Sequence, residues 1–321
     1  MVFVYTRAYN AEKTICRSID SIVNQTYKDW VYYICDNGST DSTWDLLQDY
    51  AARDNRIRLY RNEKNTTNTG FDGWTGSKIL DSLIENMDGK HYYCRLDADD
   101  EYELVFLDKT LSFMQKHDLD FAACGSEIID GQENKLIDKR ELEQDLIIEG
   151  DGFSDDFPLY VEFMRPSWGK IYKLSLLKKR DDINTRKLKY GSDTLFVIGV
   201  MRHANRMGVL SGTAHKYYLI SSSVSNKWNT DRIKAPKKLD DEFRNFLLLK
   251  SGKVNKQNDG VLCHAYLVHV KNALDVMRGA RPAFREKLYV WFYLIFNRKT
   301  IRGFVKIKWQ LVCNRIRRLS E

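Results

Sequence analysis

The stretch that decides the fold is Tyr92-Tyr93-Cys94-Arg95-Leu96-Asp97-Ala98-Asp99-Asp100-Glu101. Its first five residues form an aromatic and apolar run with a period of two, which predicts a buried strand. Asp97 and Asp99 lie two residues apart in an extended chain, so they project to the same side. Paired carboxylates repel each other unless a cation compensates them, and Mg²⁺ or Mn²⁺ takes oxygen ligands. We therefore predict a metal site that also binds phosphate oxygens; the alternative is a solvated acidic turn.

Strands and helices alternate on both sides of this stretch. Apolar runs predict strands at residues 2–5, 31–35, 57–60 and 121–129. Apolar residues at spacings of three and four predict helices at residues 15–23 and 79–87, with further helices beginning near residues 44, 103 and 193. The alternation predicts an α/β fold with a mostly parallel central sheet, covered by helices on both faces. Because ligands collect at the carboxyl ends of such strands, we expect Asp36 and Asp97 to face one pocket.

The composition indicates a single compact body with a C-terminal extension. The 321 residues contain no repeat of fixed period and no CxxC pair among six scattered cysteines. Scattered cysteines in apolar runs are typical of buried thiols in a reducing compartment. The apolar start is too short for a signal peptide, and the longest apolar run, 288–296, is too short to span a bilayer. We therefore expect a cytoplasmic protein.

The positive charge is concentrated at the C-terminus. Residues 281–321 hold eleven Lys or Arg against two Glu, a charge of +9, whereas the whole chain carries +7. Apolar and aromatic residues at helical spacing run through the same segment, which predicts a basic amphipathic helix in peripheral contact with an anionic membrane. We place that contact at the inner face of the cell membrane; the alternative is an apolar stripe that docks on the rest of the protein. No recognisable nucleic-acid-binding module accompanies the charge, so we expect no nucleic-acid partner.

Several motifs then occur in the order found in a known family: Ala8-Tyr9-Asn10 with Asn24-Gln25-Thr26-Tyr27, then Asp36-Asn37-Gly38-Ser39-Thr40-Asp41, then Asp97-Ala98-Asp99-Asp100. The chain resembles the inverting family 2 glycosyltransferases of GT-A fold, strongly over residues 2–130 and more weakly to about residue 225. The resemblance implies a Rossmann-like glycosyltransferase domain at 1–225, with its nucleotide-sugar half at 1–130 and its acceptor half at 131–225. Residues 226–321 are expected to form a helical C-terminal region that ends in the basic tail.

The resemblance also implies roles for residues of the donor half. The nucleotide base is expected beside Ala8, Tyr9 and Asp36. The DxD element Asp97-Ala98-Asp99 is expected to bind the nucleotide diphosphate through Mn²⁺ or Mg²⁺, with Asp99 as the closer ligand and Asp97 as the second. Lys78 is a candidate for the positive charge near the diphosphate. The alternatives are an Asx turn at Asp36, a core position for Tyr9 and a solvated Lys78.

In the acceptor half the family places its general base in an acidic pair ahead of a helix. Here the pair is reduced to Ser192-Asp193, so Asp193 inherits the role; the alternative is that it caps the helix. Trp168 either lines the acceptor side or belongs to the core. Asp100 is also a candidate cap, for the helix near residue 103.

The function implied is transfer of a sugar from a nucleotide sugar, a UDP-sugar in our prediction, to a hydroxyl of a glycan or lipid-linked acceptor in surface-polysaccharide synthesis. Two alternatives stay open. A sugar nucleotidyltransferase shares the sheet and the metal site but is expected to carry a Gly-rich basic loop where this chain has Thr6-Arg7-Ala8-Tyr9-Asn10. A non-catalytic sugar-nucleotide-binding partner is compatible with the altered Ser192-Asp193 pair.

Overall fold

A computed structural model describes residues 1–66, 74–87, 90–183, 188, 190–220, 227–297 and 299–301. The strands are β1 (Val2–Ala8), β2 (Trp30–Asp36), β3 (Ile57–Arg61), β4 (Tyr92–Arg95), β5 (Glu101–Tyr102), β6 (Phe121–Asp130), β7 (Lys135–Arg140), β8 (Leu146–Glu149), β9 (Lys170–Lys173) and β10 (Arg206–Leu219). The helices are α1 (Ile15–Val23), α2 (Thr43–Arg53), α3 (Trp74–Asn86), α4 (Phe106–Lys116), α5 (Gly152–Asp155), α6 (Phe157–Tyr160), the 3₁₀ helix η2 (Val161–Met164), α7 (Leu174–Leu177), α8 (Ser192–Met201), α9 (Asp231–Ser251), α10 (Lys256–Ala280) and α11 (Phe284–Phe296).

One sheet organises the N-terminal two thirds of the chain, with the strand order β3-β2-β1-β4-β9-β6-β10-β5. The strands β3, β2, β1 and β4 are parallel to one another, and β6 is parallel to β10. The short strand β9 lies antiparallel between β4 and β6 and joins these two blocks. The α/β class and the central sheet predicted from the sequence are confirmed. The sheet is mixed and not mostly parallel, because β5, β7, β8 and β9 pair antiparallel with their neighbours, which the alternation did not predict.

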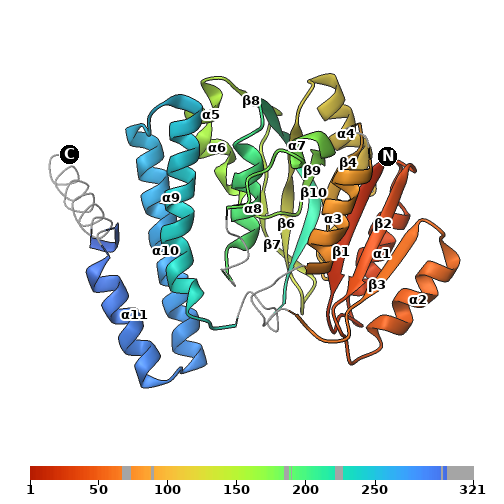
Figure 1. The fold of residues 1–321 in the computed structure, drawn as a ribbon, viewed down its shortest axis with the longest axis horizontal. Coiled ribbons are helices and arrows are strands. Elements are labelled where there is room, and N and C mark those ends of the chain that lie inside the picture. The colour runs from red at the N-terminus through yellow and green to blue at the C-terminus, as the bar shows by residue number, and fades with distance from the viewer. Residues whose placement is uncertain are drawn as a thin grey trace.

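The side chains of β1 show why helices cover both faces of this sheet (Figure 1). Val2 and Val4 point to one face, where they share a core with residues of α1, α2 and α4. Phe3 and Tyr5 point to the other face, whose core includes residues of α3, α8 and α9. Because a strand with apolar side chains on both faces has no side suited to solvent, the sequence of β1 requires this layered arrangement.

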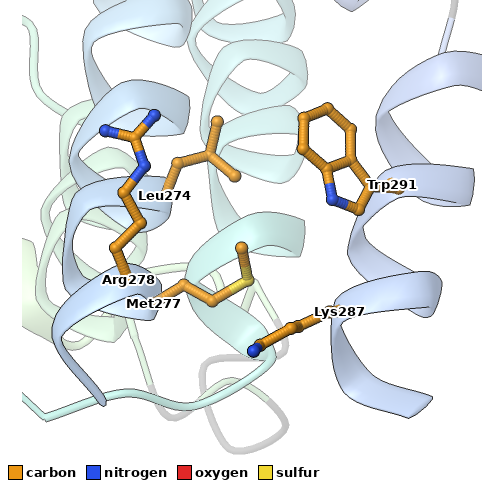
Figure 2. Close-up of a pocket in the computed structure, with 5 residues that line it drawn as sticks. All are labelled: Leu274, Met277, Arg278, Lys287 and Trp291. Atoms are coloured by element: carbon orange, nitrogen blue, oxygen red, sulfur yellow. The ribbon is translucent and has the colours of Figure 1, made fainter. Parts of the chain in front are cut away.

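The last three helices, α9, α10 and α11, stand beside the sheet domain (Figure 1). A separate apolar cluster joins them, with Tyr266 and Val270 of α10 packed near Val290 and Leu294 of α11. Between α10 and α11 lies a pocket of about 330 Å³ (Figure 2), lined by Leu274, Met277, Arg278, Lys287 and Trp291. None of the helices in the described part of the chain has the length and apolar composition needed to cross a membrane. About half of the predicted basic tail, residue 298 and residues 302–321, lies outside the described residues.

Candidate active site

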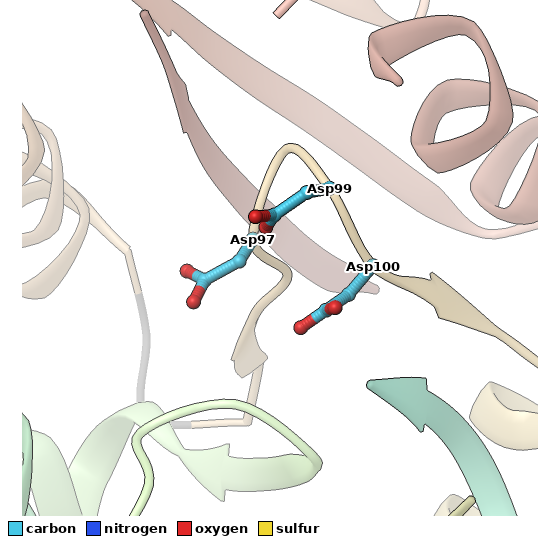
Figure 3. Close-up of side chains that lie close together, drawn as sticks. All are labelled: Asp97, Asp99 and Asp100. Atoms are coloured by element: carbon cyan, nitrogen blue, oxygen red, sulfur yellow. The ribbon is translucent and has the colours of Figure 1, made fainter. Parts of the chain in front are cut away.

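Three carboxylates converge in the loop that follows β4. One oxygen from each of Asp97, Asp99 and Asp100 lies within 4.8 Å of the others, and Figure 3 shows the side chains gathered on one side of the loop. Helix α1 holds this loop in place, since Ser18 Oγ donates to the Asp100 carbonyl at 2.6 Å. Arg17, also in α1, donates to the carbonyl of Asp99. The spacing of the acids in the sequence is thus converted into a cluster by contacts with a helix some 80 residues earlier.

The electrostatics of the cluster favour a bound cation. Burial, followed by the nearby charges of Asp100 and Asp97, raises the pKa of Asp99 to about 7. Burial also raises the pKa of Asp97, against the opposing effect of the Arg95 charge. Carboxylates that are desolvated and mutually repelling are stabilised in their ionised form by a hard divalent ion, so this donor set fits Mg²⁺ or Mn²⁺.

Asp100 does not cap a helix, which corrects one prediction. The next helix, α4, begins only at Phe106, with Val105 at its N-cap position. The Asp100 side chain is fully buried, and one of its oxygens accepts a hydrogen bond from the backbone N–H of Tyr218 at 2.9 Å. Its other oxygen lies 3.4 Å from Nε2 of His215, which is also fully buried. Asp100 therefore links the acidic loop to β10.

Asp193 lies beside the acidic loop although 96 residues separate it from Asp97 in the sequence. It is in the first turn of α8, and Arg95 Nη1 contacts its Oδ1 at 3.2 Å. Nε of the same Arg95 lies 3.7 Å from Oδ1 of Asp97. The N-cap position of α8 is occupied by Gly191, at φ +79°, so the capping alternative for Asp193 is wrong.

The residues predicted to hold the nucleotide base lie at the carboxyl ends of two neighbouring strands. Ala8 ends β1, Asp36 ends β2, and the two are paired in register. Asp36 is fully buried; its Oδ1 accepts from the backbone N–H of Ser39 at 3.1 Å, so the predicted turn at the Gly38 loop is present. Its Oδ2 lies 3.1 Å from Nε of Arg61.

Two further residues that were predicted to bind the nucleotide sugar are exposed. Tyr9 is 42% exposed, so the alternative that placed it in the core is wrong. Lys78 is exposed in α3. Residues 67–73, which precede that helix, lie outside the described part of the chain.

Trp168 reaches the acidic loop through one intermediate residue. Its ring stacks on the ring of His215, with centroids 4.3 Å apart, and on Tyr217 at 5.2 Å. Because His215 in turn contacts Asp100, the half-buried Trp168 flanks the same site. Next to it, burial lowers the pKa of Lys170 to about 7, and the Lys170 amine donates to the carbonyls of Pro166 and Trp168.

Sequence reasoning missed two residues of this site, Arg95 and His215. Arg95 precedes Asp97 by two residues, so the period of the strand places both side chains on one side and was a usable signal. His215 carried no such signal, because it reaches the loop through the pairing of β10 with β5 and lies more than 100 residues away.

A Rossmann-like sheet with an acidic cluster at its carboxyl edge is the architecture expected of a glycosyltransferase of GT-A fold. The chain belongs to glycosyl transferase family 2, whose family model matches residues 4–179, more than half of its length. The family resemblance and the GT-A fold predicted from the sequence are therefore confirmed.

Two relatives and two solved structures illustrate the similarity. An uncharacterized glycosyltransferase of Haemophilus influenzae is 28% identical over 259 residues, which cover 78% of this chain and 76% of the relative. The UDP-Glc:alpha-D-GlcNAc-diphosphoundecaprenol beta-1,3-glucosyltransferase WfgD of Escherichia coli is 30% identical over 43% of this chain and 50% of its own length. TarS 1-349 of S. aureus in complex with UDP aligns with a TM-score of 0.63 at 18% identity, over 89% of this chain and 76% of TarS. The mannosyltransferase PcManGT of Pyrobaculum calidifontis in complex with GDP-Man and Mn²⁺ aligns with a TM-score of 0.50 at 13% identity, over 96% and 87% of the two chains.

Proposed function

We propose that this glycosyltransferase moves a sugar from a UDP-sugar to a hydroxyl of a glycan or lipid-linked acceptor in surface-polysaccharide synthesis. The observation that carries the proposal is the link made by Arg95 between the Asp193 carboxylate and Asp97, which belongs to the carboxylate cluster of Asp97, Asp99 and Asp100. The name of WfgD, which specifies a UDP-linked donor and a lipid-diphosphate acceptor, supports these substrate classes. The UDP complex of TarS supports the same class of donor.

On the donor side, Ala8, Tyr9 and Asp36 would bind the nucleotide base, and Lys78 would contribute positive charge. Asp99 and Asp97 would hold Mn²⁺ or Mg²⁺, with Ala98 between them. When bound, such an ion supplies positive charge to the diphosphate of the donor. The convergence of three carboxylates and the raised pKa of Asp99 support this assignment.

On the acceptor side, Asp193 would act as the general base. Its ionised carboxylate accepts the proton of the acceptor hydroxyl while the hydroxyl oxygen attacks the anomeric carbon from the face opposite the leaving diphosphate. One displacement of this kind inverts the anomeric configuration. Trp168 would border the acceptor, where an aromatic face suits the apolar face of a sugar ring.

A thermal-shift screen of nucleotide sugars with Mn²⁺ tests the donor, followed by a transfer assay with the sugar nucleotide that binds. A ligand at about 100 times its dissociation constant raises the free energy of unfolding by roughly 2.7 kcal/mol. We expect a UDP-sugar to give the largest shift, and the shift to shrink when EDTA replaces Mn²⁺. If no nucleotide sugar shifts the transition, the proposed function is wrong.

We also propose that the glycosyltransferase domain ends at residue 225. We further propose that the protein lies peripherally at the inner face of the cell membrane. Helix α11 supports the second, because after a charged first turn its residues 288–296 are all apolar or aromatic. Val290 and Leu294 face the other helices, whereas another set of apolar side chains is exposed: Phe284, Leu288, Tyr289, Trp291, Phe292, Ile295 and Phe296. Exposed Arg281, Arg285 and Lys287 border this face, so it complements an anionic lipid surface.

Liposome flotation tests the membrane contact. We expect the chain to float with vesicles containing anionic lipid and not with purely zwitterionic vesicles. The double variant Trp291→Ser/Phe292→Ser should lose flotation, whereas Tyr60→Ser, which removes an exposed aromatic side chain from β3, should keep it. Equal flotation of all three proteins would contradict the contact.

A further inference from the structure

Arg95 lies between two carboxylates that come from distant parts of the chain. Its Nη1 contacts Oδ1 of Asp193 at 3.2 Å, and its Nε lies 3.7 Å from Oδ1 of Asp97. Its backbone is fixed on two sides. It pairs in register with Tyr5 of β1, and its carbonyl accepts a hydrogen bond from the Tyr102 hydroxyl at 2.5 Å. The guanidinium therefore projects from a backbone position that is fixed by the sheet and by Tyr102.

The chemistry of the guanidinium suits this position. It is planar, always charged and presents five donors in a fixed fork, so it donates a hydrogen bond to Asp193 from one nitrogen while another forms a longer ion pair with Asp97. The charge of Arg7 on β1 also acts on Arg95, Asp97 and Asp193. His215 acts on Asp97, and Lys170 acts on Asp193. Arg95 is nevertheless the cation that contacts both carboxylates, so without it the half-buried Asp97 and Asp193 would repel each other more strongly.

We propose that Arg95 is a positioning residue that fixes the carboxylate of Asp193 relative to Asp97 and so sets the distance between the donor site and the general base. This inference rests on the proposed function, because it assigns Arg95 a role only through these two residues. No proton is transferred to or from Arg95. Its contribution is geometric, and a displacement of about 1 Å at a reacting group lowers a rate by as much as about 100-fold.

A double-mutant cycle tests the proposal, using kcat of sugar transfer and donor binding as separate readouts. We expect Arg95→Met to lower kcat by up to about 100-fold while donor binding, measured by thermal shift, is largely kept. In an Asp193→Asn background the same substitution should change kcat little further, because the residue through which it acts has already lost its function. If kcat falls by the same factor in both backgrounds, Arg95 does not act through Asp193 and the proposal is wrong.

Arg180 offers a matched control. Its Nη2 contacts Oδ1 of Asp81 at 2.6 Å, and its side chain is 24% exposed, as is that of Arg95. Arg180→Met should leave kcat unchanged. If it lowers kcat as much as Arg95→Met does, any lost ion pair has this effect and the proposal is overturned. In Arg95→Ala, guanidinium added to the assay should partly restore kcat. A purely structural role of Arg95 would not give this rescue. Absence of transfer by the wild type contradicts the proposed function itself, whereas an active wild type with an equally active Arg95→Met contradicts this inference alone.

Discussion

At the scale of single residues, Asp193 is the side chain on which turnover should depend most. Asp193→Asn keeps the size of the side chain and its place in α8 but removes the acceptor of the hydroxyl proton. General-base assistance contributes on the order of 10²–10⁴-fold, so kcat should fall by about that factor while the thermal shift given by the donor stays the same. Steady-state kinetics with the donor identified by the screen measures this. Normal turnover by the variant would place the base elsewhere.

The contact between His269 of α10 and Arg165 should make the stability of the protein depend on pH. Nε2 of His269 accepts a hydrogen bond from Arg165 Nη1 at 2.9 Å, and burial, with the Arg165 charge, lowers the pKa of His269 to about 4. Glu162 and Arg232 also act on it, in opposite directions. Because the unfolded chain binds the proton near pH 6.5, this stabilisation is complete above that pH and is lost as the pH falls toward 4.

The free energy of unfolding should therefore fall between pH 6.5 and 4 by on the order of 1–3 kcal/mol more in the wild type than in His269→Gln. Glutamine keeps a hydrogen-bond acceptor for Arg165 but does not titrate. Urea unfolding at a series of pH values measures the difference. Parallel pH profiles for the two proteins would show that His269 is not the group responsible.

The residues of the site differ in how well the sequence could predict which of them lie close together in space. Asp97 and Asp99 are two positions apart in one loop, so their proximity could be predicted from their spacing, although a turn held by α1 and not an extended strand brings them together. Asp193 reached the same place only through the packing of α8, and the family motif, not its spacing, identified it. His215 is brought in by strand pairing alone, and no local pattern marks it.

At the scale of elements, the Gly38 loop between β2 and α2 depends on a glycine. Gly38 has φ +77°, and a Cβ at this position would lie 2.7 Å from the backbone carbon of Lys64. Gly252, at the end of α9, has φ +68°, and a Cβ there would meet no atom of the described residues within 4 Å. Both Ala variants share a conformational cost of about 1 kcal/mol, but only Gly38→Ala also displaces neighbouring backbone.

Gly38→Ala should therefore lower the free energy of unfolding by clearly more than Gly252→Ala, as measured by urea titration. It should also weaken the thermal shift given by a UDP-sugar, because the loop continues directly from Asp36. Equal destabilisation by the two variants would show that residues 64 and 65 move aside at no cost.

Elements with an apolar repeat were predictable, and those without one were not. Helix α1 was predicted from the spacing of its apolar residues, and Ile15, Ile19 and Ile22 do form a buried stripe. Strand β7 was missed because its side chains are almost all exposed and its sequence, KLIDKR, lacks alternation. The four residues of β9 are too few to show a period, and their antiparallel direction is set by neighbours that are distant in the sequence.

At the scale of the whole molecule, the C-terminal helices α9, α10 and α11 pack against the sheet domain. Phe243 and Phe246 of α9 belong to the same core as Phe153 of α5 and Phe157 of α6, so α9 completes that core. Arg165, which contacts α10 through His269, also accepts a hydrogen bond at its carbonyl from Thr194, the neighbour of Asp193. The C-terminal helices thus connect the exposed face of α11 with the segment that carries Asp193.

The account depends on a cation held by Asp99 and Asp97 that anchors the diphosphate of a UDP-sugar. Anomalous diffraction at the manganese edge, from crystals grown with Mn²⁺ and UDP, tests this most directly. We predict one anomalous peak within bonding distance of an Asp99 oxygen and of the UDP diphosphate, and no such peak in Asp99→Asn crystals. Ordered UDP with no manganese beside Asp99, or no UDP at this edge of the sheet, would contradict the account.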